Sequence, residues 1–63
     1  MNYEVGQTLV WIPASQHEKH CPTVTVTGLR KRGHAMLSNG WVVDEDGRAE
    51  GTSRQPGGHV EVP

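Results

Sequence analysis

Three short stretches of the sequence carry side chains that could take part in chemistry. The first is His-Glu-Lys-His-Cys at residues 17–21, between two prolines. On one helical turn, residues at i, i+3 and i+4 share a face, and imidazole and thiolate groups are zinc ligands. His17, His20 and Cys21 could therefore bind zinc, with His34 or His59 as a fourth ligand. The alternative interpretation is a polar surface loop, and we assign no metal site.

The other two stretches are charged runs of opposite sign. The basic run is Arg30-Lys31-Arg32, and the acidic run is Asp44-Glu45-Asp46. The basic run could contact phosphates, with salt-dependent affinity, or could be a solvated turn. The acidic run could dock on a basic partner, and would form a larger acidic patch if the fold brings Glu50 beside it. Segregated charges in a chain of net charge −1 indicate steering toward a partner more than bulk affinity for nucleic acid.

A catalytic centre needs a nucleophile, a base and an oxyanion donor in one pocket. A chain of 63 residues has little room for such a pocket. Cys21 follows His20 directly, and chain neighbours rarely present their side chains in line. We therefore expect neither an enzyme nor a cofactor.

The length predicts one domain with a small core. A chain this short buries only about 60% of the surface that its unfolded form exposes, and 33% of its residues are hydrophobic. Its one cysteine excludes an internal disulfide and fits a reducing compartment. No stretch is apolar and long enough for a signal peptide or a membrane span. We expect a cytosolic protein that does not enter the membrane, as a monomer or a small homo-oligomer.

Alternating apolar residues predict an all-β fold that positions these stretches. The clearest strand is 23–29, Thr-Val-Thr-Val-Thr-Gly-Leu, where Gly28 at a break in the alternation indicates a bulge or bend. Trp41 is expected in the core, whereas Trp11 is evenly balanced between core and an exposed protein-binding anchor. The other strands are expected at 3–12, 34–37, 41–44 and 59–62, with a short edge strand near 48–51.

The hairpin around residues 37–41, Leu-Ser-Asn-Gly-Trp, has two possible turns. A two-residue turn at Asn39-Gly40 scatters the apolar side chains over both faces. A three-residue loop at 38–40 pairs Leu37 with Trp41 and Ala35 with Val43, which gathers them on one face. Because register follows the buried face, we predict the three-residue loop, with Gly40 left-handed.

The stretches Val-Gly-Gln-Thr-Leu-Val-Trp-Ile-Pro (5–13), Val-Thr-Val-Thr-Gly-Leu (24–29) and Leu-Ser-Asn-Gly-Trp-Val-Val-Asp (37–44) resemble a group of small phage and prophage proteins. The resemblance implies an SH3-like (KOW/Tudor-like) β-barrel and a mobile-element origin. The chain departs from the family pattern at 17–21, where arginines are usual, and at His34, where an aromatic residue is common.

These observations predict a small SH3-like barrel of about five strands, spanning residues 1–63. Phage proteins of this size often block a host or defence enzyme by binding it, although fold does not fix function. We therefore expect a phage-derived protein that modulates or inhibits a host or defence protein in the host cytosol. The alternative is a nucleic-acid-binding barrel. The residues expected to bind the partner are His17, Glu18, Lys19, Arg30, Lys31, Arg32, Asp44, Glu45 and Asp46.

Overall fold

The alternating segments form six antiparallel strands in a computed structural model, which describes residues 2–14, 22–52, 54 and 56–63. The described part contains no helix long and apolar enough to cross a membrane. In chain order the elements are β1 (Thr8–Pro13), β2 (Thr23–Leu29), the 3₁₀ turn η1 (Lys31–Gly33), β3 (Ala35–Leu37), β4 (Val42–Val43), β5 (Arg48–Ala49) and β6 (Gly58–Glu61).

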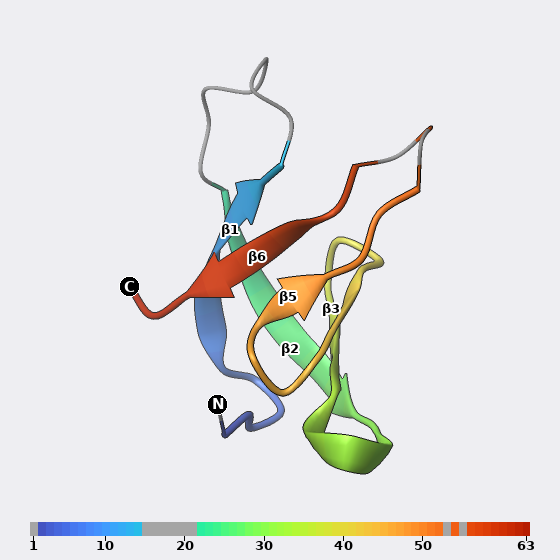
Figure 1. Cartoon of the computed structure of the whole chain (residues 1–63). Coiled ribbons are helices and arrows are strands. Elements are labelled where there is room, and N and C mark those ends of the chain that lie inside the picture. Colours follow the sequence, from blue (N-terminus) through green and yellow to red (C-terminus); the bar gives the residue numbers. More distant parts are fainter. Residues whose placement is uncertain (1, 15–21, 53, 55) are drawn as a thin grey trace.

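The strands curl into a nearly closed barrel because the two ends of the sheet meet (Figure 1). Their spatial order is β4-β3-β2-β1-β6-β5. β4 and β5, at opposite ends of this order, are joined by a tight turn. Within it, the Asp44 N–H donates to the Arg48 carbonyl over 2.9 Å, and the Gly47 N–H donates to the Asp44 carbonyl over 3.0 Å. The predicted small SH3-like barrel is confirmed, with six strands in place of about five.

Along the strands, every second side chain points inward, and these inward-facing side chains form the core. Trp11 is only 5% exposed. Of the two alternatives that the sequence left open, a core position and an exposed anchor, the core position is therefore the correct one. Trp41 is half-buried and stacks on Trp11, with ring centroids 6.0 Å apart and an interplanar angle of 16°. Such a pair contributes about 0.5–1.5 kcal/mol beyond the area that it buries. The buried hydrophobic residues are Leu9, Trp11, Val24, Val26, Ala35, Leu37, Val43, Ala49 and Val60.

The predicted bulge and hairpin register are both present. The pairing of β2 with β3 shifts between Val26 and Gly28, so that Gly28 lies opposite Met36. Ala35 pairs with Val43, and the Leu37 N–H donates to the Trp41 carbonyl over 2.9 Å. Gly40 has a φ of 92°, as the three-residue loop requires. Met36 is consequently directed away from the core.

The last strand enters the barrel where only glycine fits. β6 pairs with β1 on one side and with β5 on the other. A Cβ added to the buried Gly57 would overlap the Ala49 carbonyl and lie 2.8 Å from the Gly51 nitrogen. Both neighbours are backbone atoms, which cannot turn aside as a side chain does.

Gly57→Ala should therefore lower the free energy of unfolding by about 1–3 kcal/mol, a usual cost of overpacking. Chemical denaturation followed by circular dichroism measures this change. Gly28→Ala is the matched control, since its Cβ would meet only the terminal methyl of Met36, which can rotate away. Equal costs for the two variants would contradict the assigned backbone clash.

Candidate interaction site

The basic run forms the tip of the β2–β3 hairpin. We call residues 30–34 the basic turn. The Arg30 N–H donates to the His34 carbonyl over 2.8 Å, and the His34 N–H donates to the Lys31 carbonyl over 3.4 Å. Arg32 has a φ of 64°, in the left-handed region. The side chains of Arg30, Lys31 and Arg32 are all exposed, so the hydrogen-bonded turn presents three cations to solvent.

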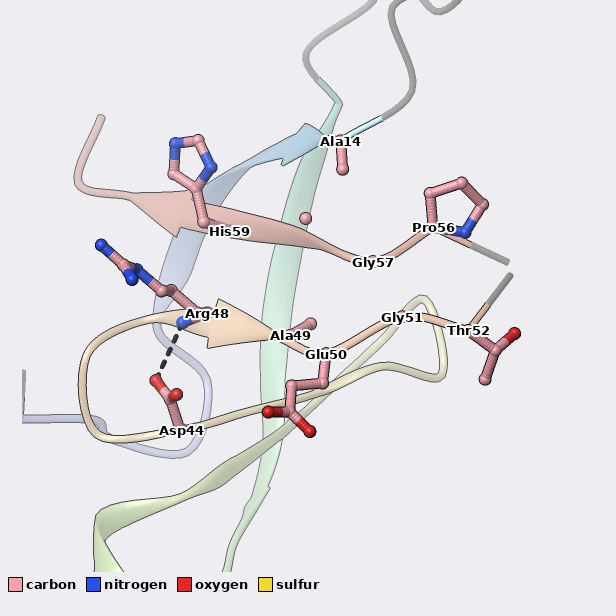
Figure 2. Close-up of a pocket in the computed structure, with 11 residues that line it drawn as sticks. Ala14, Asp44, Arg48, Ala49, Glu50, Gly51, Thr52, Pro56, Gly57 and His59 are labelled. Atoms are coloured by element: carbon pink, nitrogen blue, oxygen red, sulfur yellow. Dashed lines mark hydrogen bonds between the residues drawn. The ribbon is translucent and has the colours of Figure 1, made fainter. Parts of the chain in front are cut away.

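The acidic run lies in the β4–β5 turn, residues 44–47, which we call the acidic turn. The Asp44 carboxylate shapes it, because Oδ1 accepts the N–H groups of Asp46 (2.8 Å) and Arg48 (3.0 Å); Figure 2 draws the second bond. Glu45 and Asp46 are exposed, whereas Asp44 is half-buried. Asp44 thus has a structural role in the turn that the sequence analysis did not assign.

The hydrogen bonds of the acidic turn set the electrostatics around it. The pKa of Asp44 is lowered, chiefly by the backbone N–H of Arg48 and further by the N–H of Asp46 and the nearby His34. The Tyr3 hydroxyl donates to the Asp44 carbonyl over 2.6 Å. Burial raises the pKa of Tyr3, and the charges of Asp44 and Asp46 raise it further. Tyr3 therefore remains a neutral donor that ties the N-terminal segment to this turn.

The two charged turns lie side by side at one end of the barrel. A Cβ added to Gly33 would lie 3.4 Å from the Cβ of Glu45, which puts the backbone of the basic turn against the acidic turn. In the sequence the two runs are separated by eleven residues (33–43), and their spacing alone does not place them together. The fold thus makes one surface of mixed charge, which we call the charged end (residues 2–3, 29–34, 36 and 42–50).

His34 lies at the centre of the charged end, because it lines three open recesses. From the sequence, His34 was a possible zinc ligand and a departure from the family pattern, and its position close to the basic run was the signal that could have placed it here. The basic recess is lined by Leu29, Arg30, Lys31, Arg32, His34, Met36 and Val42. The acidic recess is lined by His34, Val42, Val43, Asp44, Glu45, Arg48 and Glu50. The third is lined by Asn2, Tyr3, Leu29, Arg30, Gly33 and His34.

The acidic recess confirms that the barrel brings Glu50 close to the acidic run. Glu50 lines it together with Asp44 and Glu45, although Asp46 does not. Arg48 lies in the same recess. The patch is therefore acidic with one cation inside it.

A further open recess lies beside β5 and β6 (Figure 2). It shares Asp44, Arg48 and Glu50 with the acidic recess. Its polar side chains include Asp44, Arg48, Glu50 and His59. In Figure 2 the His59 ring points away from the Asp44 and Glu50 carboxylates. The Nε2 of His59 instead lies 3.5 Å from a carboxylate oxygen of Glu61. These groups diverge, so they do not form a nucleophile–base pair around one reacting atom.

The predicted contact residues His17, Glu18 and Lys19 lie outside the described residues, as do His20 and Cys21 of the possible zinc site. The two histidines considered as a fourth zinc ligand lie apart, His34 at the charged end and His59 on β6. Within the ranges that the structure describes, no three histidine, cysteine, aspartate or glutamate side chains are grouped as metal ligands. The contacts predicted for residues 17–19 stay predictions.

The side chains of all three Trp and Tyr residues of the chain pack in the core or against it. Trp11 is buried, Trp41 stacks on it, and Tyr3 packs against the core while its hydroxyl binds the Asp44 carbonyl. Binding of single-stranded nucleic acid usually relies on exposed aromatic side chains on which bases stack. The charged end thus offers cations and aliphatic groups, but no exposed aromatic ring.

No protein-family model matches the chain, and no curated protein or solved structure shows significant similarity to it.

The lowered pKa of Asp44 predicts a specific acid sensitivity. A carboxylate with a folded-state pKa below its ordinary value of 3.8 stabilises the native state above that value, and this contribution is lost as pH falls through the folded-state pKa. Asp44→Asn keeps an oxygen acceptor but removes the titration. The fall in thermal midpoint below about pH 4 should be shallower in this variant than in the wild-type protein.

The matched control for this experiment is Asp46→Asn, which removes a charge from the same turn. There the backbone N–H, and not the carboxylate, makes the hydrogen bond to Asp44. An equally shallow fall in Asp46→Asn would mean that loss of a charge from this turn, and not loss of the hydrogen bonds accepted by the Asp44 carboxylate, causes the effect. Identical acid profiles for Asp44→Asn and the wild-type protein would contradict the assigned role of Asp44.

Proposed function

We propose that the chain is a phage-derived binding protein that modulates or inhibits a host or defence-system protein by covering part of its surface. The observation that carries the proposal is the convergence of the basic and acidic turns on one end of the barrel, around His34. The barrel serves as the scaffold, and the charged end is the contact surface. The residues expected to make the contact there are Arg30, Lys31, Arg32, Glu45 and Asp46.

The mixed charge favours a protein partner over a polyanion. A nucleic acid or an anionic membrane presents negative charge over a long surface, so it would meet Glu45 and Asp46 as well as the cations beside them. Like charges placed opposite each other weaken an interface, whereas complementary patterns steer and orient a protein partner. A host protein that carries acidic and basic groups in the reverse arrangement satisfies both turns at once.

The form of the recesses supports binding without catalysis. Those of the charged end are open to solvent, and the core of the barrel is filled by side chains. Catalysis depends on converging groups in a site that excludes water. The polar side chains beside β5 and β6 diverge (Figure 2). Occlusion of a partner needs only a rigid surface, which a small barrel provides.

The phage origin and the host cytosol as the place of action come from the resemblance of the three quoted stretches. The structure adds that these stretches are the parts that form β1, β2 and the β3–β4 hairpin. The single cysteine is compatible with a reducing cytosol.

Capture from host cytosol followed by mass spectrometry tests the proposal. The tagged wild-type chain should enrich one host protein, and both R30A/K31A and E45A/D46A should reduce the enrichment at least about tenfold, as loss of close charge pairs does. The control R54A/E61A likewise removes two charged side chains, here one cation and one anion, outside the recesses of the charged end. It should capture like the wild type, and circular dichroism checks that each variant folds. Recovery of nucleic acid alone would reverse the proposal.

A second candidate function, nucleic-acid binding, is favoured by one observation. Arg30, Lys31 and Arg32 are exposed on one hydrogen-bonded turn. Without exposed aromatic rings, contact would depend on charge and hydrogen bonding from these cations, chiefly to phosphates, and not on base stacking.

If this second function holds, affinity for duplex DNA should fall steeply with salt. In R30A/K31A/R32A the slope of log affinity against log salt should become shallower, by about 0.9 for each lost phosphate contact. Fluorescence anisotropy with a labelled duplex at several salt concentrations measures it. Absence of binding at low salt eliminates this candidate.

A further inference from the structure

The basic recess combines cationic and exposed apolar surface. Four large hydrophobic side chains are exposed in the described part of the chain, and two of them, Leu29 at 56% and Met36 at 39%, line this recess. The other two, Val5 and Val62, do not line it. Apolar side chains gathered in a recess with a polar rim mark an interaction site more often than scattered ones do.

The register of the strands keeps this apolar surface exposed. On β3 the neighbours of Met36, Ala35 and Leu37, are buried, so Met36 faces outward. Opposite it stands Gly28, and a Cβ there would lie 2.6 Å from the Met36 terminal methyl. The methyl thus occupies the space left free by the glycine. Leu29 follows at the end of β2, past the bulge, where little of the chain covers it.

The rim of the recess is positively charged and held in place. Arg30, Lys31 and Arg32 all line it, and the Arg30–His34 hydrogen bond of 2.8 Å closes the turn that carries them. A preformed turn binds with a smaller loss of conformational entropy than a loop that must become ordered. Guanidinium groups pair with carboxylates in two-point hydrogen bonds. The rim therefore fits carboxylates, next to an aliphatic floor.

We propose that the basic recess binds an acidic peptide segment of a partner protein. An apolar side chain of the segment packs on Leu29 and Met36, and carboxylates on either side of it pair with the basic turn. Methionine suits this contact because its flexible thioether adapts to different apolar shapes. The proposal rests on the proposed function and specifies the chemistry of the partner.

An acidic peptide fits this recess better than a nucleic acid or a membrane does. The floor is aliphatic, and bases stack on aromatic rings. The acidic turn begins on the other side of His34, within contact of Gly33, and would repel an extended anionic surface. A short segment can follow the basic recess without crossing the acidic turn.

Titration with three short peptides tests this inference: one alternating Glu and Leu, one alternating Glu and Ser, and one alternating Lys and Leu. Amide chemical shifts of the ¹⁵N-labelled chain report the site, and isothermal titration calorimetry gives the affinity. The Glu/Leu peptide should shift amides in 28–36 and bind at least about tenfold more tightly than either of the others. Equal binding of the Glu/Ser or Lys/Leu peptide would overturn the inference.

Variants separate the two parts of the recess. L29S/M36S should lower the affinity for the Glu/Leu peptide about tenfold because it removes the apolar surface of the recess. R30E/K31E should lower it by a similar factor because it reverses the charges that pair with the carboxylates. R54E is a single charge reversal outside the recess and should bind like the wild type, with dispersed amide spectra showing that each variant folds. Unchanged affinity in L29S/M36S overturns the inference. Tighter binding of duplex DNA, or of phosphatidylserine-containing vesicles, than of the Glu/Leu peptide also overturns it.

The same variants distinguish failure of this inference from failure of the proposed function. If L29S/M36S still captures the host protein that E45A/D46A loses, the charged end binds a partner but the basic recess does not hold an acidic segment. If no variant of the charged end changes capture of a host protein, both proposals fail together.

Discussion

The carboxylate of Asp44 organises the turn on which closure of the barrel depends. β4 and β5 are the two ends of the strand order, and the residues 44–48 that join them leave room for only a few hydrogen bonds. Asp44 supplies most of them, through its side chain to Asp46 and Arg48 and through its backbone to Arg48, Gly47 and Tyr3. An aspartate that accepts backbone N–H groups is a common way to shape a short turn. Here it also holds the sheet in its curved form.

The small core limits what the rest of the chain can do. Nine buried residues, none of them polar, make up the core of the described part, and the two tryptophans stack at its margin. A domain of this size gains little stability beyond the entropy that it loses on folding. The aromatic rings therefore stabilise the fold, and the proposed contacts fall on the turns between strands, where charged groups and a few aliphatic groups are exposed.

In the proposed function, the turns that complete the fold at the charged end are also the contact surface. The acidic turn closes the barrel and also exposes Glu45 and Asp46, while the basic turn packs its Gly33 against Glu45. Opposite charges on neighbouring turns give this surface an electrostatic polarity, which would orient the proposed protein partner and disfavour a uniform polyanion. Because both turns are tightly hydrogen-bonded, the charges are presented on a frame that needs little rearrangement on binding.

The sequence was sufficient to predict the strands to within a few residues, although the first was expected from residue 3 and begins at Thr8. It was also sufficient for the bulge at Gly28 and the register of the 38–40 hairpin, because alternation and glycine positions are local signals that one buried face makes consistent. It also identified both charged runs, while the central position of His34, the structural use of Asp44 and the need for glycine at position 57 escaped it. Three further features became clear from the fold: the two runs share one end, Trp11 is buried, and Leu29 and Met36 line the basic recess. These features depend on how the bent sheet closes, and closure brings together residues whose separation along the chain carries no signal of their contact.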